Sequence, residues 1–183
     1  PMSAAAVHRC PMPTVPGRSL EVSDEEPAVS ARLSSPAGVA VRGSEIVVAD
    51  SDNHSLVYYS PSAGLVRLLG GQPGEAGNRD GAGREARFRT PTGLAIATDG
   101  ALLAVADTGN DTVRLVRLSD GGSGRIRGIV STLGRASSSK GRLPAGAPAG
   151  DPLTLEDPRA VAFDGIGSIC LVDALGASVV TRP

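Results

Sequence analysis

The sequence predicts an all-β protein built from about three four-stranded antiparallel units. Sliding the 183-residue sequence over itself reveals a repeat, the first feature to look for in any chain. The repeated segments are short apolar runs of strand length, separated by turn residues. Three of these runs end on an aspartate, at Asp50, Asp107 and Asp173, and the intervals between these aspartates are 57 and 66 residues.

The clearest copy is residues 91–118, PTGLAIATDGALLAVADTGNDTVRLVRL, which reads as three strands at 94–96, 101–106 and 113–118. The turn sequences TDG and DTGND separate these strands. A three-stranded meander of this size cannot bury both of its faces alone. The segment therefore requires neighbouring sheets, and the chain supplies two near copies of it.

The copies follow the same strand order. The first strand recurs at 36–41 and 158–163, the middle strand at 46–50 and 169–173, and the third at 55–59 and 178–181. Fourth-strand candidates precede the linkers at 65–69 and 126–133, and the same offset predicts another at 6–10. Pro36, Pro91 and Pro158 open the first strands, a position where a missing N–H costs little.

Three units result, at roughly 1–60, 61–118 and 119–183, each ordered as fourth strand, linker and strands one to three. Residues 1–35 are predicted to hold the N-terminal strand and a proline-rich, then acidic linker, and residues 36–183 the blades, with a flexible insertion at 134–152. Starting on a fourth strand and ending on a third is an offset by which β-propellers can close. Because propellers have about four to eight blades, three units predict a fragment or a half-ring, which a second copy would complete to six blades.

The turn after the middle strand has its own signature. Asn53, Asn110 and Gly176 stand at the same offset from the aspartates of their units. Asparagine and glycine tolerate positive φ best, so this offset is predicted to need a left-handed residue. The carboxylates of Asp50, Asp107 and Asp173 are predicted to accept backbone N–H groups of the same turn. All six residues are therefore interpreted as structural turn residues.

These motifs resemble NHL-repeat β-propellers. The first unit reads DSDNHSL at 50–56, which contains the family's Asn-His-Leu with one residue inserted before the leucine. The linker from Gly77 to Ala86, with Phe88 and the PTGLA of 91–95, also resembles the segment before many NHL repeats. The second and third units depart from the motif. The resemblance covers about residues 31–183 and implies the fold far more strongly than a function.

The resemblance implies several functions, because the family includes interaction scaffolds, RNA binders, receptor sensor domains and a few enzymes. The leading interpretation is a non-catalytic scaffold for protein–protein binding, since a rigid propeller lets its loops vary. Contacts are expected from the turns around Asp52 and His54 and at 108–111, or from the long linkers, expected on the opposite rim. The protein partner is unknown, and self-association into a six-bladed ring is a further expectation.

An RNA-binding propeller is the first alternative, because arginines are frequent in the linkers and on one third strand. The candidates for an interaction surface are Arg84, Arg87, Arg89, Arg114 and Arg117, beside Asp52 and His54. A basic face could gather from these residues although the net charge of the chain is −1. Few aromatic groups are present to stack on bases, with two Tyr and two Phe in the chain, and this weakens the alternative.

A metal-dependent lyase or hydrolase is the second alternative. The chain has two histidines, His8 and His54, whereas a catalytic zinc site usually takes three protein ligands. Neither histidine has an evident partner for a Ser-His-Asp arrangement. The prediction is therefore no enzyme, with no catalytic residue, metal or cofactor assigned.

Composition limits the remaining classes. A net charge of −1 gives no global attraction to nucleic acid or membranes, and no apolar run reaches the length of a membrane span. Cys10 and Cys170 lack metal or redox spacing, which favours a reducing compartment or no redox role. An intracellular, cytoplasmic location without membrane association is the resulting expectation.

Overall fold

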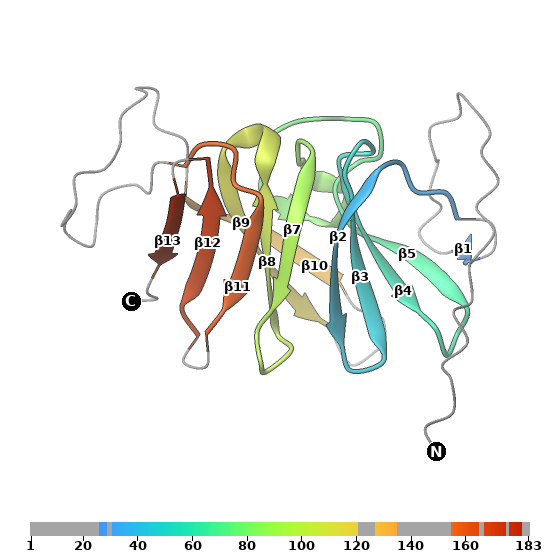
Figure 1. Cartoon of the computed structure of the whole chain (residues 1–183). Coiled ribbons are helices and arrows are strands. Elements are labelled where there is room, and N and C mark those ends of the chain that lie inside the picture. Colours follow the sequence, from blue (N-terminus) through green and yellow to red (C-terminus); the bar gives the residue numbers. More distant parts are fainter. Residues whose placement is uncertain are drawn as a thin grey trace, which may run out of the picture.

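The repeated apolar runs form antiparallel sheets in the computed structural model of the chain, which describes residues 26–28, 31–120, 127–134, 155–164, 167–174 and 176–180. Two sheets have five strands and one has three (Figure 1). The predicted all-β class is confirmed. The predicted strand at 6–10 and almost all of the predicted insertion at 134–152 lie outside the described residues.

The first sheet is a four-stranded meander with a short extra strand at its outer edge. Its strands are β2 (Pro36–Arg42), β3 (Glu45–Asp50), β4 (Ser55–Ser60) and β5 (Leu65–Gly70), and β1 (Glu26–Pro27) pairs with β5. Each turn is short enough that sequential strands pair side by side. The predicted fourth strand at 65–69 therefore closes the sheet that precedes it, so this sheet joins strands from two predicted units.

The second sheet repeats this arrangement. It comprises β7 (Pro91–Ile96), β8 (Leu102–Asp107), β9 (Thr112–Ser119) and β10 (Arg127–Gly134), with β6 (Gly81–Ala82) at its outer edge. Two 3₁₀ turns accompany it, η1 (Gly83–Glu85) in the linker and η2 (Thr108–Asn110) between β8 and β9. The third sheet comprises β11 (Ala160–Phe163), β12 (Ile169–Asp173) and β13 (Gly176–Val180).

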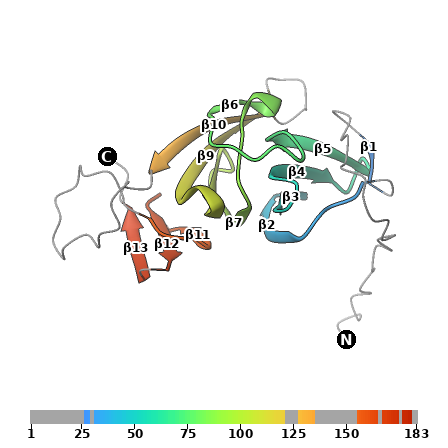
Figure 2. The same ribbon diagram turned by 90° about the horizontal axis from the view of Figure 1, so that it is seen from above.

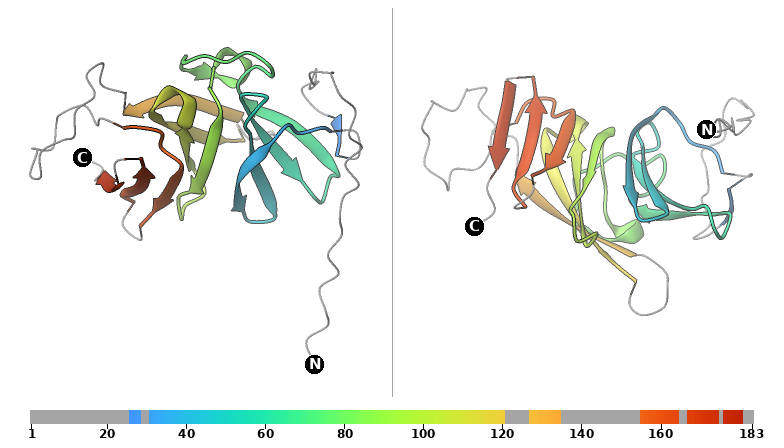
Figure 3. Two further views of the ribbon diagram at one scale, coloured as in Figure 1. Left: turned by 45° about the horizontal axis from the view of Figure 1, so that its top comes forward. Right: turned by 60° about the horizontal axis from the view of Figure 1, so that its bottom comes forward.

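The sheets stand side by side like the blades of a fan. Viewed from above, the first strands β2, β7 and β11 line the concave side of an arc, while β5 and β10 lie on its convex side (Figures 2 and 3). Strand β7 contacts both β2 and β11. This radial arrangement is that of a β-propeller, in which each sheet covers one face of the next.

Glycine allows the first strands to approach each other backbone to backbone. A Cβ at Gly38 would lie 1.9 Å from the carbonyl oxygen of Thr92, and one at Gly93 would lie 2.5 Å from that of Arg159. Both distances are far inside van der Waals contact. A glycine at this position of the first strand is therefore a condition of the spacing between sheets.

The main core fills the space between the first two sheets. Val47 and Leu56 from the first sheet meet Leu103 and Val116 from the second, and all four side chains are fully buried. The linker contributes Phe88, which is also fully buried in this cluster. A smaller cluster of Val113, Leu155 and Leu171, with Val161 against it, joins the second and third sheets. Alternate residues of each strand thus serve alternate interfaces.

The residue before each first-strand proline adopts a left-handed conformation. Ser35, Thr90 and Asp157 have φ values of +50°, +48° and +51°. Serine and threonine rarely adopt positive φ, whereas aspartate does so more often. The threefold recurrence shows that the chain enters every sheet by the same bend.

Candidate functional site

Each middle strand ends in a buried carboxylate that ties two segments together. Asp50 is fully buried, and its Oδ1 accepts a hydrogen bond from the backbone N–H of Ser34 at 2.6 Å. Its Oδ2 accepts one from Asn53 Nδ2 at 2.7 Å. Burial raises the pKa of the Asp50 carboxyl, an effect that these hydrogen bonds only partly offset. The N–H donor thus comes from the preceding linker, not from the turn that the sequence had suggested.

Asp107 repeats these contacts in the second sheet. Its Oδ1 accepts from Arg89 N at 2.7 Å, and its Oδ2 accepts from Asn110 Nδ2 at 2.8 Å. Asn110 Nδ2 also donates to the carbonyl oxygen of Gly77 at 2.7 Å. Burial raises the pKa of the Asp107 carboxyl despite these donors. In the third sheet Asp173 accepts from Glu156 N at 3.4 Å.

The expected left-handed residues lie one position later than predicted in the first two sheets. His54 and Asp111 have φ values of +55° and +51°, whereas Asn53 and Asn110 do not have positive φ and instead use their side-chain amides on the aspartates. Gly176 has φ +138° and donates its N–H to Asp173 Oδ1 at 3.0 Å. The prediction for Asn53 and Asn110 is therefore wrong, because a local propensity for positive φ was outweighed by a hydrogen bond.

The first turn also binds the next sheet through two hydrogen bonds, which we call the clasp. The hydroxyl of Ser51 donates to the carbonyl oxygen of Pro91 at 2.6 Å. His54 Nδ1 accepts from the backbone N–H of Thr90 at 3.1 Å. The second turn repeats both bonds, as the following contacts show.

In the second clasp the hydroxyl of Thr108 donates to the carbonyl oxygen of Pro158 at 2.6 Å. Asp111 Oδ1 accepts from the backbone N–H of Asp157 at 2.8 Å. Histidine and aspartate thus play one role, since either supplies an acceptor from a left-handed residue. The sequence carried a signal for the hydroxyl, because serine and threonine follow Asp50 and Asp107 directly.

Arg114 is a buried structural residue. Its side chain is fully buried, and Nη1 donates to Asp107 Oδ2 and to the carbonyl oxygen of Arg87, both at 2.9 Å. Nη2 donates to Asp80 Oδ1 at 2.6 Å, and the guanidinium lies 5.2 Å from the centre of the Phe88 ring. This arginine hydrogen-bonds the linker to the second sheet, and because it is fully buried it cannot contact a binding partner.

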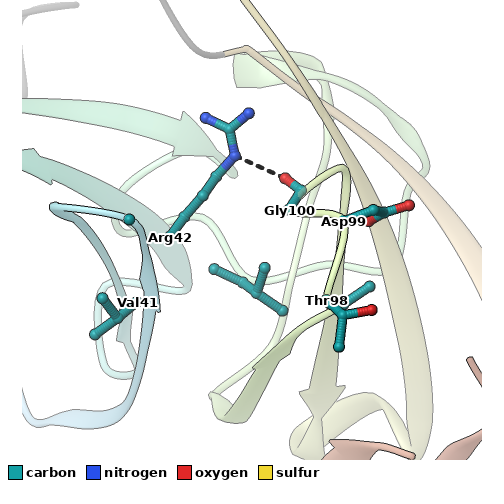
Figure 4. A pocket seen from close by; sticks show the side chains of 8 residues that line it. Val41, Arg42, Thr98, Asp99 and Gly100 are labelled. Carbon is teal, nitrogen blue, oxygen red and sulfur yellow. Dashed lines mark hydrogen bonds between the residues drawn. The ribbon is translucent and has the colours of Figure 1, made fainter. Parts of the chain in front are cut away.

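A cleft opens between the β2–β3 and β7–β8 turns, on the rim opposite to the turns that follow Asp50 and Asp107. It has a volume of about 540 Å³ and is lined by Val41, Arg42 and Gly43 on one side and by residues 96–100 on the other. The Nε of Arg42 donates to the carbonyl oxygen of Gly100 at 2.7 Å, so this side chain crosses from one sheet to the next (Figure 4). Among the described residues, the two terminal nitrogens of Arg42 have no hydrogen-bond partner.

The carboxylates near Arg42 are engaged elsewhere. Asp99 lies beyond the Gly100 carbonyl from the guanidinium (Figure 4), and its Oδ1 accepts from Ala101 N at 2.9 Å. Glu45, in the same turn as Arg42, accepts from the hydroxyl of Ser60 at 3.2 Å. Burial, together with a hydrogen bond to Glu45, raises the pKa of Tyr58 to about 12. The cleft therefore presents a positive charge beside two carboxylates, each of which accepts a hydrogen bond from another residue.

A family model described as the NHL repeat matches residues 33–59, the segment that holds Asp50, Asn53 and the first clasp. The chain contains an NHL repeat. It is 36% identical over 93 residues to NHL repeat-containing protein 2 of Bos taurus and 37% identical over 95 residues to Protein SUPPRESSOR OF QUENCHING 1, chloroplastic, of Arabidopsis thaliana. These matches cover 49% and 51% of the chain but only 13% and 9% of the relatives' length.

Solved structures agree on the fold of this NHL-repeat chain. An auxiliary nutrient binding protein of Bacteroides ovatus superposes with a TM-score of 0.61 at 18% identity, covering 83% of the chain and 38% of that protein. Its counterpart from Bacteroides thetaiotaomicron gives a TM-score of 0.58 at 15% identity, covering 78% of the chain and 37% of that protein. These superpositions, together with the NHL-repeat match at 33–59, confirm the predicted β-propeller fold, while such low identity says nothing about ligands.

The candidate interaction residues of the NHL turns and linkers do not form one patch. Arg87 is bound to Glu75 Oε2 through Nε and Nη2, at 3.1 and 2.8 Å. Arg84 reaches Gln72 Oε1 at 3.2 Å. Asp52 is exposed beside the Ser35 hydroxyl, while Arg89 and Arg117 are exposed on different elements. Together with the burial of Arg114, this spreads the predicted basic face over separate places.

The linkers lie on the same rim as the aspartate turns, not on the opposite one as expected. Asn110 contacts Gly77, and the N–H of Gly74 donates to the carbonyl oxygen of Asn53 at 3.0 Å. The physical reason is that a linker leaves the outer strand and enters the next first strand at one end of the sheets. The Arg42 cleft, which sequence reasoning missed, is therefore on the rim that the linkers leave open.

The described part of the chain contains no cluster of three or more His, Cys, Asp or Glu side chains placed to hold a metal ion. It also contains no helix long and apolar enough to cross a membrane. Cys170 is a half-buried free thiol on β12, while Cys10 and His8 lie outside the described residues.

Proposed function

We propose that this NHL-type propeller chain is a non-catalytic interaction module that binds an acidic segment of a protein partner in the Arg42 cleft. The observation that carries the proposal is the state of Arg42. Its Nε is fixed by the Gly100 carbonyl at 2.7 Å, and its terminal nitrogens have no partner in the described part of the chain. A charged group is thus held in place with its binding edge open.

The chemistry of arginine selects the ligand. A guanidinium presents parallel N–H donors that match a carboxylate in two-point geometry. Because one nitrogen is already tethered, little side-chain freedom remains to be lost on binding, which favours affinity. A volume of about 540 Å³ admits a few residues of an extended peptide.

The rim that carries the turns after Asp50 and Asp107 is a less suitable binding surface. Its repeated polar groups bond to each other within the fold, as Asn53 does to Asp50 and Asn110 does to Asp107. The arginines expected to contact RNA are dispersed, and Arg114 is buried against two aspartates. No observation therefore favours the RNA-binding or the metal-dependent alternative over protein binding.

The test uses the full chain and a fluorescein-labelled octapeptide of alternating Glu and Ala, with the Gln–Ala peptide as its neutral match. Fluorescence anisotropy should show binding of the acidic peptide, and Arg42→Ala should weaken it about tenfold, since a charge-assisted pair of bonds is lost. Arg42→Lys should retain part of the affinity.

The matched control is Arg117→Ala, which removes an exposed arginine from β9 and should leave binding unchanged. Melting temperatures of all variants guard against unfolding, because Arg42→Ala also removes the bond to Gly100. Equal affinity of the wild type and Arg42→Ala in a folded protein, or equal binding of the Gln–Ala peptide, would refute the proposed site.

A further inference from the structure

We propose that the outer face of the first sheet is a docking surface for one more propeller blade, of a kind that a second copy of this chain cannot supply. The outer face is the side of β2–β5 turned away from the second sheet. The blade it fits has Asp-Ser or Asp-Thr at the end of its middle strand, an acceptor on the left-handed residue that follows, and glycine on its first strand.

The apolar part of this surface matches two interfaces that are already filled. Val39 and Val41 on β2 are 64% and 62% exposed. The same positions of the second sheet are held by Leu94 and Ile96, which pack against the core between the first two sheets. In the third sheet Val161 occupies the position of Val39 and packs in the smaller core. Val39 and Val41 therefore occupy positions that pack against a preceding sheet in the second sheet and, for Val39, also in the third, but here no sheet of the described chain covers them.

The polar part of the surface is also ready. In the filled interfaces, Thr90 and Asp157 donate their N–H to a clasp, and the following prolines accept a hydroxyl. Ser35 has the same left-handed conformation, with φ +50°, and Pro36 follows it. Within the described ranges no other sheet supplies a hydroxyl or an acceptor to Ser35 or Pro36. The backbone at Ser35 and Pro36 therefore has the conformation found in the two filled interfaces but, among the described residues, lacks the clasp hydrogen bonds.

A second copy does not carry the matching face. Its Ser51 and Thr108 hydroxyls already bind its own prolines. In its third sheet Asp173 pairs with Gly176, leaving two residues between them, whereas Asp50 and Asp107 pair across four. The short turn begins with Ala174, which has no hydroxyl.

The first strand of the third sheet differs in the same sense. Ala160 pairs with Val172, as Gly38 pairs with Ala49. A Cβ at Gly38 or Gly93 would collide with the next sheet, so Ala160 keeps a further sheet away. Val172 is 50% exposed where Ala49 and Ala106 are fully buried. Turn length, hydroxyl and glycine thus agree that the two ends of the arc are not complementary.

The test restores the missing features in the full chain and measures oligomeric state by light scattering. The repaired variant carries Ala160→Gly and has residues 174–175 replaced by the Ser-Asp-Asn-His of 51–54. The wild type should be monomeric. The repaired variant should form a dimer, because its third sheet can now clasp the first sheet of another copy.

Adding Val39→Asp to the repaired variant should return it to a monomer, and circular dichroism should show that each variant keeps its β-sheet signal. A folded repaired variant that stays monomeric would overturn the docking surface. A wild type that dimerises, and loses the dimer with Val39→Asp alone, would overturn the claim that a second copy cannot supply the blade. These outcomes are independent of peptide binding at Arg42.

Discussion

At the scale of single residues, the fold depends on buried polar side chains that hydrogen-bond to backbone groups. Asn110 bridges Asp107 and the carbonyl of Gly77, so one amide joins the end of a strand to a linker. The same asparagine was assigned correctly to the turn from sequence, but for a conformational reason that applies to its neighbour. The contact partner Gly77 is 33 residues away in the chain, which no local pattern reveals.

Asn110→Ala should lower the free energy of unfolding by about 1–3 kcal/mol, because it leaves a buried carboxylate with one donor fewer. Urea denaturation followed by circular dichroism measures this change. The control is Asn78→Ala at an exposed linker position, which should be neutral within about 0.5 kcal/mol. Equal stability of the two variants would contradict the role of the amide.

Asp80 should give the chain an acid-sensitive contact. Burial alone would raise the pKa of its carboxyl, but hydrogen bonds from Arg114 and Thr132 and the charge of Arg114 hold it below the ordinary value of 3.8. A lowered pKa in the folded state contributes stability above the unfolded pKa, and this contribution is lost as pH falls through the folded value. The wild type should therefore melt higher than Asp80→Asn at pH 6.

The difference in melting temperature between wild type and Asp80→Asn should shrink as the pH is lowered from 5 toward 2, as the wild-type carboxylate becomes protonated. Since the Asp80 side chain is 46% exposed, the effect at pH 6 is expected to be modest and weaker at high salt. A difference that does not change with pH would show that the charge of Asp80 has no part in it.

At the scale of elements, the turn after the middle strand does two tasks in the first two sheets: it closes its own hairpin and it bonds to the next sheet. The register across the turn decides whether it can do so. A turn of four residues places a hydroxyl and an acceptor at the neighbouring strand, whereas the turn of the third sheet has two residues and begins with Ala174, which has no hydroxyl. The alignment of Gly176 with Asn53 and Asn110, natural in the sequence, is therefore not a structural equivalence.

Ser51→Ala and Thr108→Val should each lower stability by about 1 kcal/mol, since each removes a hydroxyl bond between sheets. Because the two clasps lie in different interfaces, the double variant should lose about the sum. Thermal or chemical denaturation measures all three, with the exposed Ser119→Ala on β9 as the control. A single clasp variant that behaves like Ser119→Ala would show that the bond contributes nothing.

At the scale of the whole molecule, the spacing between sheets is set by backbone contact at glycine. Gly38→Ala should lower the free energy of unfolding by about 3 kcal/mol or more. The new Cβ would lie 1.9 Å from the backbone oxygen of Thr92, which, unlike a side-chain atom, cannot move away by a change of rotamer. Gly64→Ala is the comparison, since its φ is +65° with open space around it. That variant should cost only about 1–2 kcal/mol. Similar losses at both glycines would refute the close approach.

The sequence by itself determined the strands and the meander, because alternating apolar runs and turn residues act locally and recur at a readable interval. The resemblance to NHL repeats at 50–56 extended this to the fold, which the family match at 33–59 and the solved structures confirm. The repeat itself, before any resemblance, indicated Asp50, Asp107 and Asp173 as turn residues, since the middle strand ends there in every copy.

Only the tertiary structure decided which polar residues remain available to a partner. Arg114 looked exposed on an alternating strand, yet it is buried because Asp80 and Asp107 converge on it from a linker and a strand end. Arg42 looked ordinary, yet the neighbouring sheet fixes it at a cleft. Contacts between sheets join residues far apart in the chain, and their geometry depends on sheet spacing and register, which no local sequence pattern specifies.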